Sequence, residues 1–444
     1  MSWRDTFAAL AGALGGGEDG AHTFLALAAE DTDFVRFNHG KVRQAGSVAQ
    51  GHLDVRRIRG RRHATSRITV TGDVARDLAQ MRAAIAALDE IVAAVPEDPH
   101  LLVDVGGGHS ERVEPAALPT AGEAVDAVLQ AARHPEPADL VGVWQSGALH
   151  RALASTYGHR HWFTSAGFAL DYSLVHDKDR AVKRTFAGTR WDADALAADV
   201  DGARVALALL ARPARFVPPG RYRAWLSPAA VGEIFDLFGW GDFGARSQQT
   251  RSSALLKLAV GEVQLDPRIT VTERVAGGLA PGFSDDGFVK PDEVPLIRAG
   301  QHAGCFVSPR SAVEFGLEAN GADAGESFAA LVMDGGDLPD ADVLAALGTG
   351  VYVSNLWYLN HSDRNAARFT GMTRFATFWV EDGEIVAPLN VMRFDETVGN
   401  ILGANLEGLT AERDLRLSSD TYFARSTDSA RLPGALVRDF TFTL

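Results

Sequence analysis

Apolar and polar residues alternate along much of residues 22–70, which predicts β-strands. In GHLDVRR, Leu53 and Val55 alternate with polar neighbours, a period of two that is typical of a sheet with one face in water. Asn38-His39-Gly40 predicts a turn, because Asn and Gly adopt turn conformations readily. We expect HTFLALAAE, FVRFNHGKVRQAG, GHLDVRRI and SRITV to form separate strand segments, and more strands to follow between residues 140 and 189.

An apolar residue at every third or fourth position predicts helices between and after these strands. Asp73 has a side chain suited to cap a helix N-terminus, and the helix that follows it is expected to end at Pro96. The apolar stripe of this helix consists of Val74, Leu78, Met81, Ile85, Leu88, Val92 and Val95. Further helices are predicted at residues 5–14, 122–133, 192–211 and 228–238.

A proline-rich stretch divides the chain into two predicted domains. ARPARFVPPGRYR contains Pro213, Pro218 and Pro219, and such a composition is typical of a linker. We therefore expect an N-terminal α+β domain at residues 1–215 and a β-rich domain at residues 221–444. Strands come in runs with helices between them, so the predicted fold class is α+β: an N-terminal antiparallel sheet with long helices, followed by a β-rich C-terminal domain.

The composition limits the partners of the chain. Its 444 residues carry a formal net charge of −14, which argues against nucleic acid and anionic membranes, because both attract clustered Lys and Arg. No stretch reaches the roughly 18 uninterrupted apolar residues of a membrane helix, and we expect a cytoplasmic protein. Cys305 is the single cysteine, so one chain cannot surround zinc with cysteines. The negative charge also favours a substrate that is not strongly acidic.

The segment NLWYLNHSDRNAARFTG, residues 355–371, combines aromatic, basic and acidic residues with His361. The residues from Val351 to Tyr358 are apolar at alternate positions on both faces, which predicts a strand packed on two sides. The rest of the segment is expected to be a loop before the strand RFATFWV, with His361 as a hydrogen-bonding residue rather than a base. Asp382-Gly383 predicts the tip of a hairpin.

The order of motifs in residues 348–409 resembles the C-terminal block of the TldD/PmbA family. The segment begins with GTGVYVS, continues through ARFTG and includes FWVEDGEIVAP, which matches that family's G-hydrophobic-Y-V-S strand, its TG pair and its F-W-V-E-[DN]-G-E-I-x-x-P strand. FVRFNHGKVRQAG resembles the family's early E-x-x-x-R-F-x-x-x-x-I-x-x strand. The resemblance covers essentially the whole chain and implies the fold of this family.

The family contains two kinds of subunit. The TldD type is similar to a zinc metalloprotease, with H-E-x-x-x-H on a helix and a cysteine downstream, whereas the TldE/PmbA type lacks these residues and pairs with the TldD type. In the matching helix of this sequence, Gly232 and Leu237 stand at the histidine positions and Glu233 is kept. Residues 177–301 contain no histidine, and no cysteine follows Cys305. The resemblance therefore implies no metal or other cofactor in this chain, and zinc in the partner.

The same resemblance implies a heterodimeric metallopeptidase that degrades or matures unfolded peptides, with this chain as its non-catalytic subunit. An alternative is a stand-alone homodimeric peptide-binding protein without peptidase activity, in keeping with the name "modulator of DNA gyrase" attached to the family. A third is an autonomous enzyme that uses His159, His161 and Asp171, the two histidines lying on one face of a strand. The residues expected to bind peptide or form the subunit interface are Asn355, Trp357, Tyr358, His361, Arg368 and Arg374.

Overall fold

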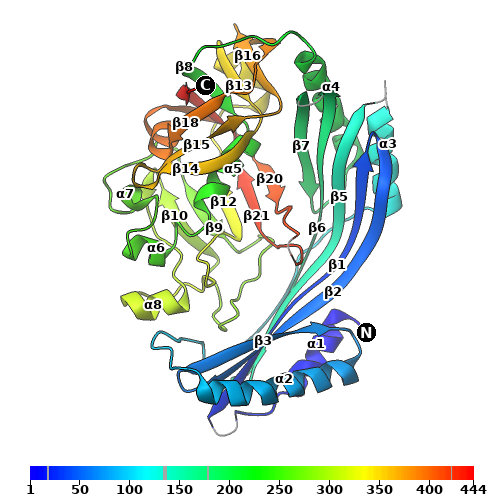
Figure 1. Ribbon diagram of the computed structural model, residues 1–444, viewed down its shortest axis with the longest axis vertical. Helices are drawn as coiled ribbons and strands as arrows, with labels where there is room; N and C mark the ends of the chain where they lie inside the picture. Colours follow the sequence, from blue (N-terminus) through cyan, green and yellow to red (C-terminus); the bar gives the residue numbers. More distant parts are fainter. Residues whose placement is uncertain (18–19, 134–137, 178–179, 422) are drawn as a thin grey trace.

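The computed structural model describes residues 1–17, 20–133, 138–177, 180–421 and 423–444. Within these residues the strands form three sheets, of seven, six and nine strands. The seven-stranded sheet belongs to the N-terminal part of the chain, and the other two belong to the C-terminal part (Figure 1). Runs of strands with helices between them confirm the predicted α+β fold class. None of the helices within the described residues is long and apolar enough to cross a membrane.

The N-terminal sheet has the strand order β3-β2-β1-β5-β6-β4, with β7 also paired to β6. Its neighbours run antiparallel, except that β4 and β6 are parallel. Its long strands curve around the C-terminal part, and α3 and α4 lie on the far side (Figure 1). The elements are α1 (Trp3–Gly12), β1 (Ala21–Asn38), β2 (Lys41–Arg59), β3 (Arg62–Val70), α2 (Val74–Ala94), β4 (Gly108–Val113), α3 (Ala121–Arg133), β5 (Asp139–Ser155), β6 (His159–Asp177), β7 (Arg180–Gly188) and α4 (Ala193–Leu210).

Most of these elements agree with the sequence pattern. The Asp73 side chain accepts hydrogen bonds from the backbone N–H groups of Ala75 and Arg76, as predicted for a cap. The turn at residues 39–40 is also present. The predicted division into separate strands is wrong at two places. HTFLALAAE and the start of FVRFNHGKVRQAG form the single strand β1, and the end of FVRFNHGKVRQAG and GHLDVRRI form the single strand β2. The polar residues 31–33 do not interrupt β1, because they stay in register with both neighbouring strands.

The C-terminal part consists of a six-stranded and a nine-stranded sheet that pack around one large apolar core. The strand order of the six-stranded sheet is β11-β10-β9-β12-β21-β20. The strand order of the nine-stranded sheet is β14-β15-β18-β22-β8-β13-β16-β17, with β19 paired to β22. The elements are β8 (Gly220–Leu226), α5 (Pro228–Phe238), α6 (Ala245–Gln249), α7 (Leu256–Ala259), β9 (Val271–Arg274), β10 (Glu293–Arg298), β11 (Gln301–His302), α8 (Pro309–Phe315), β12 (Ala330–Met333), α9 (Val343–Leu347), β13 (Gly350–Val353), β14 (Leu356–Asp363), β15 (Arg368–Thr373), β16 (Thr377–Glu381), β17 (Glu384–Pro388), β18 (Arg393–Thr397), β19 (Leu406–Leu409), β20 (Asp414–Leu417), β21 (Ser429–Leu432) and β22 (Ala435–Phe442).

Helix α5 and the β16–β17 hairpin are where the sequence predicted them. The Ser227 side chain caps α5, and Ile234, Phe235 and Phe238 bury its apolar face in the core. Both residues at the hairpin tip, 382 and 383, have positive φ, which a two-residue turn of this kind requires. The residues between α4 and β8 link the two parts of the chain, and the domain limits 1–215 and 221–444 stay a prediction.

Candidate functional site

Residues 355–371 form a two-stranded hairpin, which corrects the prediction of a loop there. β13 ends at Val353, and β14 pairs with β15 in antiparallel orientation. Packing on both faces is found for β13, where Val351 and Val353 lie in one core and Tyr352 packs against another. β14 is the outermost strand of its sheet, and its Tyr358 is exposed. A bulge between Trp357 and Asn360 breaks the alternation, and Tyr358 within the bulge has a φ of 57°. A bulge adds a residue to one strand without changing the apolar pattern, so the sequence does not reveal it.

Of the predicted site residues, Trp357 and Arg374 come together. The Arg374 guanidinium carbon lies 5.2 Å from the centroid of the Trp357 ring, within the range of a cation–π interaction. Trp357 also meets Phe375 edge to face, with 5.9 Å between ring centroids. Both rings line a cavity beside the N-terminal sheet. No carboxylate among the described residues pairs with Arg374, so its charge is available to a ligand near these rings.

Three other predicted residues do not line this cavity. The Asn355 side chain is buried and accepts a hydrogen bond from Ser354 Oγ at 2.8 Å. Tyr358 is 74% exposed to solvent. Arg368 forms an ion pair with Asp395 on β18, with 3.2 Å between Nη1 and Oδ1. These three residues lie outside the cavity, and their role in peptide binding or at the subunit interface stays a prediction.

His361 packs against the end of α5 instead of the cavity. Its Nε2 lies 3.5 Å from Oδ2 of the buried Asp242, and its ring meets Phe238 edge to face at 5.2 Å. Burial lowers the pKa of His361, the charge of Arg364 lowers it further, and Asp242 opposes the change. A neutral imidazole in this position orders the hairpin against α5.

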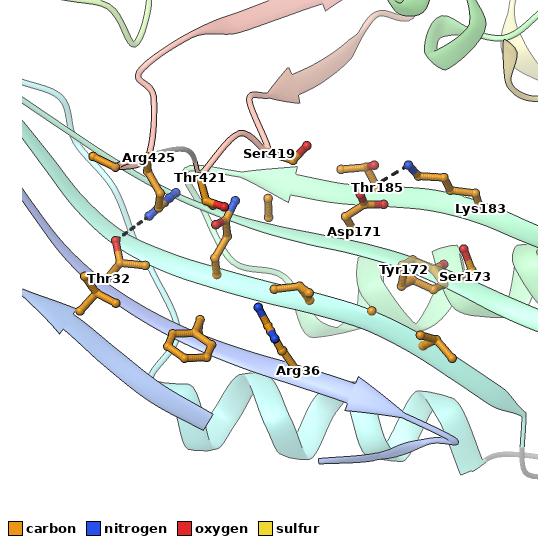
Figure 2. A pocket seen from close by; sticks show the side chains of 18 of the residues that line it. Thr32, Arg36, Asp171, Tyr172, Ser173, Lys183, Thr185, Ser419, Thr421 and Arg425 are labelled. Atoms are coloured by element: carbon orange, nitrogen blue, oxygen red, sulfur yellow. Dashed lines mark hydrogen bonds and ion pairs between the residues drawn. The ribbon is translucent and has the colours of Figure 1, made fainter. Parts of the chain in front are cut away.

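The cavity has a volume of 560 Å³ and lies between the N-terminal sheet and the C-terminal part (Figure 2). Its floor is one face of β1, β2, β5, β6 and β7. Strand register places Arg36 on β1 beside Val143 on β5, and Val143 beside Asp171 on β6. Val35, between the floor residues of β1, is buried on the opposite face in the core formed with α3 and α4. The alternation along β1 therefore separates a core face from a ligand-accessible face.

Residues 418–421 and 423–428, which we call the covering segment, cross over this floor. Hydrogen bonds attach the segment to the sheet: among them, Gln50 Nε2 donates to the Phe423 carbonyl at 2.9 Å, and Arg151 Nη2 donates to the Arg425 carbonyl at 3.1 Å. Ser419, Thr421 and Arg425 face the cavity from this side (Figure 2). The cavity thus combines residues that are almost 400 positions apart in the chain.

The helix position that resembles a zinc motif lies next to this cavity. A Cβ atom on Gly232 would come within 2.6 Å of Nε of Arg416, which projects from β20. Burial raises the pKa of Glu233, Asp236 raises it further, and Arg416 and the cavity residue Lys183 lower it. The residues here do not fit a zinc ion, because Gly232 and Leu237 offer no electron pair and Arg416 places a cation at the site.

The histidines of β6 are held in separate hydrogen bonds. His159 accepts from or donates to Ser155 Oγ at 2.6 Å through Nδ1, and its Nε2 lies 2.8 Å from Asp104 Oδ2. His161 Nδ1 lies 2.7 Å from Ser110 Oγ. Asp171 follows His159 by twelve residues on the same strand, a separation of roughly 40 Å at about 3.3 Å per residue. The three residues of the autonomous-enzyme alternative therefore cannot share one site. No group of three or more His, Cys, Asp and Glu side chains in the described part of the chain could hold a metal ion.

The sequence did not single out Arg36, Arg416 or Arg425. The alternation of side chains along β1 could have indicated Arg36, because Arg36 lies on the same face of the strand as Thr32 and Phe34. Arg416 and Arg425 lie in a stretch without a clear period, so only the folded chain shows that they reach α5 and the N-terminal sheet.

Comparison with known proteins places the fold. Residues 219–444 match the model of the PmbA/TldA metallopeptidase C-terminal domain. The structure of TldE from Thermococcus kodakarensis has a TM-score of 0.78 at 14% identity, covering 95% of this chain and 97% of that chain. A putative modulator of a DNA gyrase from Thermotoga maritima has a TM-score of 0.77 at 13% identity, covering 100% of both chains. A putative modulator of DNA gyrase from Bacteroides thetaiotaomicron has a TM-score of 0.71 at 14% identity, covering 99% of this chain and 97% of that chain.

No curated protein matches the chain. The structural likenesses, at such low identity, concern the fold alone. The match to the C-terminal domain, in contrast, spans half of the sequence and includes α5, β14 and the covering segment. It confirms the resemblance carried by residues 348–409, and this protein belongs to the TldD/PmbA family.

Proposed function

We propose that this chain is the non-catalytic, TldE/PmbA-type subunit of a cytoplasmic metallopeptidase whose TldD-type subunit holds the zinc. The observation that carries the proposal is the composition of α5, where Gly232 and Leu237 replace the ligands and the Arg416 side chain lies against Gly232. The fold shared with TldE from Thermococcus kodakarensis supports it. Without ligands this helix cannot activate a water molecule through zinc.

The second part of the proposal is that this chain helps to bind the unfolded peptide that the pair degrades or matures. The 560 Å³ cavity offers apolar area at Trp357 and Phe375 and hydrogen-bonding groups along the sheet. β14 has one neighbouring strand among those described, so its other edge can pair with an extended peptide. The cavity residues Lys183 and Asp171 lie close enough to Glu233 for their charges to affect its pKa, so substrate bound here is near the motif helix.

Peptidase activity of the chain alone and of its mixture with a TldD-type partner tests the proposal. Hydrolysis only in the mixture supports it. A stable homodimer that binds peptides and leaves the activity of the partner unchanged would instead support the stand-alone peptide-binding protein.

Replacement of Trp357 tests substrate binding within the pair. We expect Trp357→Ala to raise the KM for an unstructured peptide about tenfold with little change in kcat, since a large aromatic contact typically contributes over 1 kcal/mol. His361→Ala is expected to change KM less than about twofold, because His361 packs on α5 and not on the cavity. Steady-state kinetics of the two pairs decides the matter. Equal KM values for both variants and the unmodified pair would show that the cavity does not contribute to substrate binding.

A further inference from the structure

Arg425 is a buried cation with few partners. Its side chain is 6% exposed, although it lines the 560 Å³ cavity. Its Nη1 donates to Thr32 Oγ1 at 3.3 Å and its Nη2 donates to the Gly167 carbonyl at 3.4 Å, both longer than usual for a hydrogen bond. Nε has no partner. Burying a guanidinium with so few hydrogen bonds is costly unless an anion completes them.

The sheet makes room for this guanidinium. Gly147 on β5 is paired with Gly167 on β6, and Gly147 is also paired with Thr32 on β1. Neither glycine has a side chain to fill the face of the sheet, so Arg425 reaches the backbone there. Gly147 has a φ of +152°, and a Cβ atom on it would meet the Asp31 carbonyl at 1.9 Å, so a larger residue cannot replace it without a shift of the backbone.

The carboxylate whose charge acts on Arg425 already accepts other hydrogen bonds. Glu30 accepts hydrogen bonds from Gln50 Nε2 at 2.5 Å and from Thr32 Oγ1 at 3.0 Å. Its charge acts on Arg425, opposing the fall in the Arg425 pKa that burial causes. No carboxylate oxygen of the described residues forms an ion pair with Arg425, so the guanidinium of this cavity-lining residue keeps N–H donors without a partner.

Arg36 adds a second cation to the same cavity. It projects from β1, is exposed, and forms no ion pair with any carboxylate among the described residues. In Figure 2 its guanidinium points toward the end of the cavity where Thr421 and Arg425 lie. Lys183, by contrast, lies 3.5 Å from Asp171. Of the described residues that line the cavity, three are cationic and two are carboxylates, in a chain of net charge −14.

We propose that the Arg36–Arg425 end of this cavity is a subsite for a carboxylate of an extended peptide, either its C-terminal group or an Asp or Glu side chain. Arginine suits this role, because its planar fork matches the two oxygens of a carboxylate. Gln145 supplies a neutral amide at the same floor, and Trp357 and Phe375 contact the apolar part of the peptide. The inference rests on the proposed peptide-binding function and specifies which chemical group the cavity recognises.

Three N-acetylated, unstructured peptides of one neutral sequence test the subsite on the isolated full chain by calorimetry. The first has a free C-terminal carboxylate, the second a C-terminal amide, and the third the amide with one internal Glu. We expect a peptide with a carboxylate to bind about tenfold more tightly than the neutral amide, because a hydrogen bond to a charged group contributes that much. The first peptide alone showing the gain identifies the C-terminal group, and the third showing it identifies the side chain.

Arg425→Gln and Arg36→Gln are expected to abolish this preference, and Arg438→Gln, a matched change of an exposed arginine paired with Glu407, is expected to keep it. Arg36 is exposed, so its variant decides the test even where the buried Arg425 variant fails to fold. Equal affinities for all three peptides, or a preference that survives Arg36→Gln and any folded Arg425→Gln, would overturn the inference. If the isolated chain prefers peptides with a carboxylate but does not affect peptide cleavage by the partner, the subsite is supported and the proposed function is contradicted. If the chain is needed for cleavage but shows no preference for a carboxylate, the proposed function is supported and the subsite is contradicted.

Discussion

An unstructured peptide is expected to remain intact when incubated with this chain alone and to be cleaved once an H-E-x-x-x-H relative from the same source is added. The expected gain is at least about a hundredfold over the chain alone, because zinc lowers the pKa of its bound water to about 7 and so supplies hydroxide at neutral pH. Metal analysis of the purified pair should give about one zinc per pair, held by the partner's motif. The chain alone should carry less than about a tenth of that amount, since Gly232 and Leu237 cannot replace the ligands.

Two controls separate this result from contamination or a general effect of added protein. A chelator should abolish the activity of the mixture, and restored zinc should return it. An unrelated protein added in place of this chain should not reproduce the gain. Stoichiometric zinc and peptidase activity in the chain alone would contradict the proposal, and its histidines would then need to be examined for another metal site.

The sequence predicted regular elements well wherever one segment contained the whole signal. The stripe from Val74 to Val95 and the cap at Asp73 define α2, and Ser227 with Pro228 marks the start of α5. Helix periodicity and caps depend on neighbouring residues only, so no knowledge of the tertiary structure is needed. The family motif in residues 348–409 identified the C-terminal part for the same reason.

The candidate site was harder to predict, because its residues come from distant segments. Thr32 and Arg425 are separated by 393 positions, and no local pattern connects them. The prediction for residues 355–371 failed differently, since the bulge at Tyr358 changes which residues face the cavity without changing their composition. It named Trp357, which lines the cavity, together with Arg374 and Asn355, which do not, and their role in binding stays a prediction.

A second expected result concerns Glu273, on the central strand β9. Its side chain is 5% exposed. Oε1 accepts hydrogen bonds from the backbone N–H groups of Ala329 and Ala330 at 3.0 and 2.8 Å, and Oε2 has no partner. Burial raises the pKa of this carboxyl from its ordinary 4.5 to about 7, although the two N–H groups and Lys290 favour the charged form. The folded state therefore holds the proton more tightly than the unfolded state does.

A raised pKa means that this group stabilises the fold fully below pH 4.5 and loses that contribution as the pH rises toward 7. The difference amounts to about 3 kcal/mol in the free energy of unfolding, at about 1.36 kcal/mol per pKa unit. Glu273→Gln keeps the acceptor for Ala329 and Ala330 and cannot ionise. We expect the variant to differ from the unmodified chain by less than about 1 kcal/mol at pH 5 and to be up to about 3 kcal/mol more stable at pH 8, measured by urea unfolding.

Glu293→Gln is the matched control, because Glu293 is an exposed carboxylate on the neighbouring strand β10, paired with Arg274. Its effect should stay below about 1 kcal/mol at both pH values. A Glu273→Gln effect that does not change between pH 5 and pH 8 would contradict the assignment. The position matters for the cavity, since Glu273 holds the N–H groups at the start of β12, and β12 pairs with β21 directly after the covering segment. Glu273 therefore helps to hold the strand that pairs with β21 at the end of the covering segment.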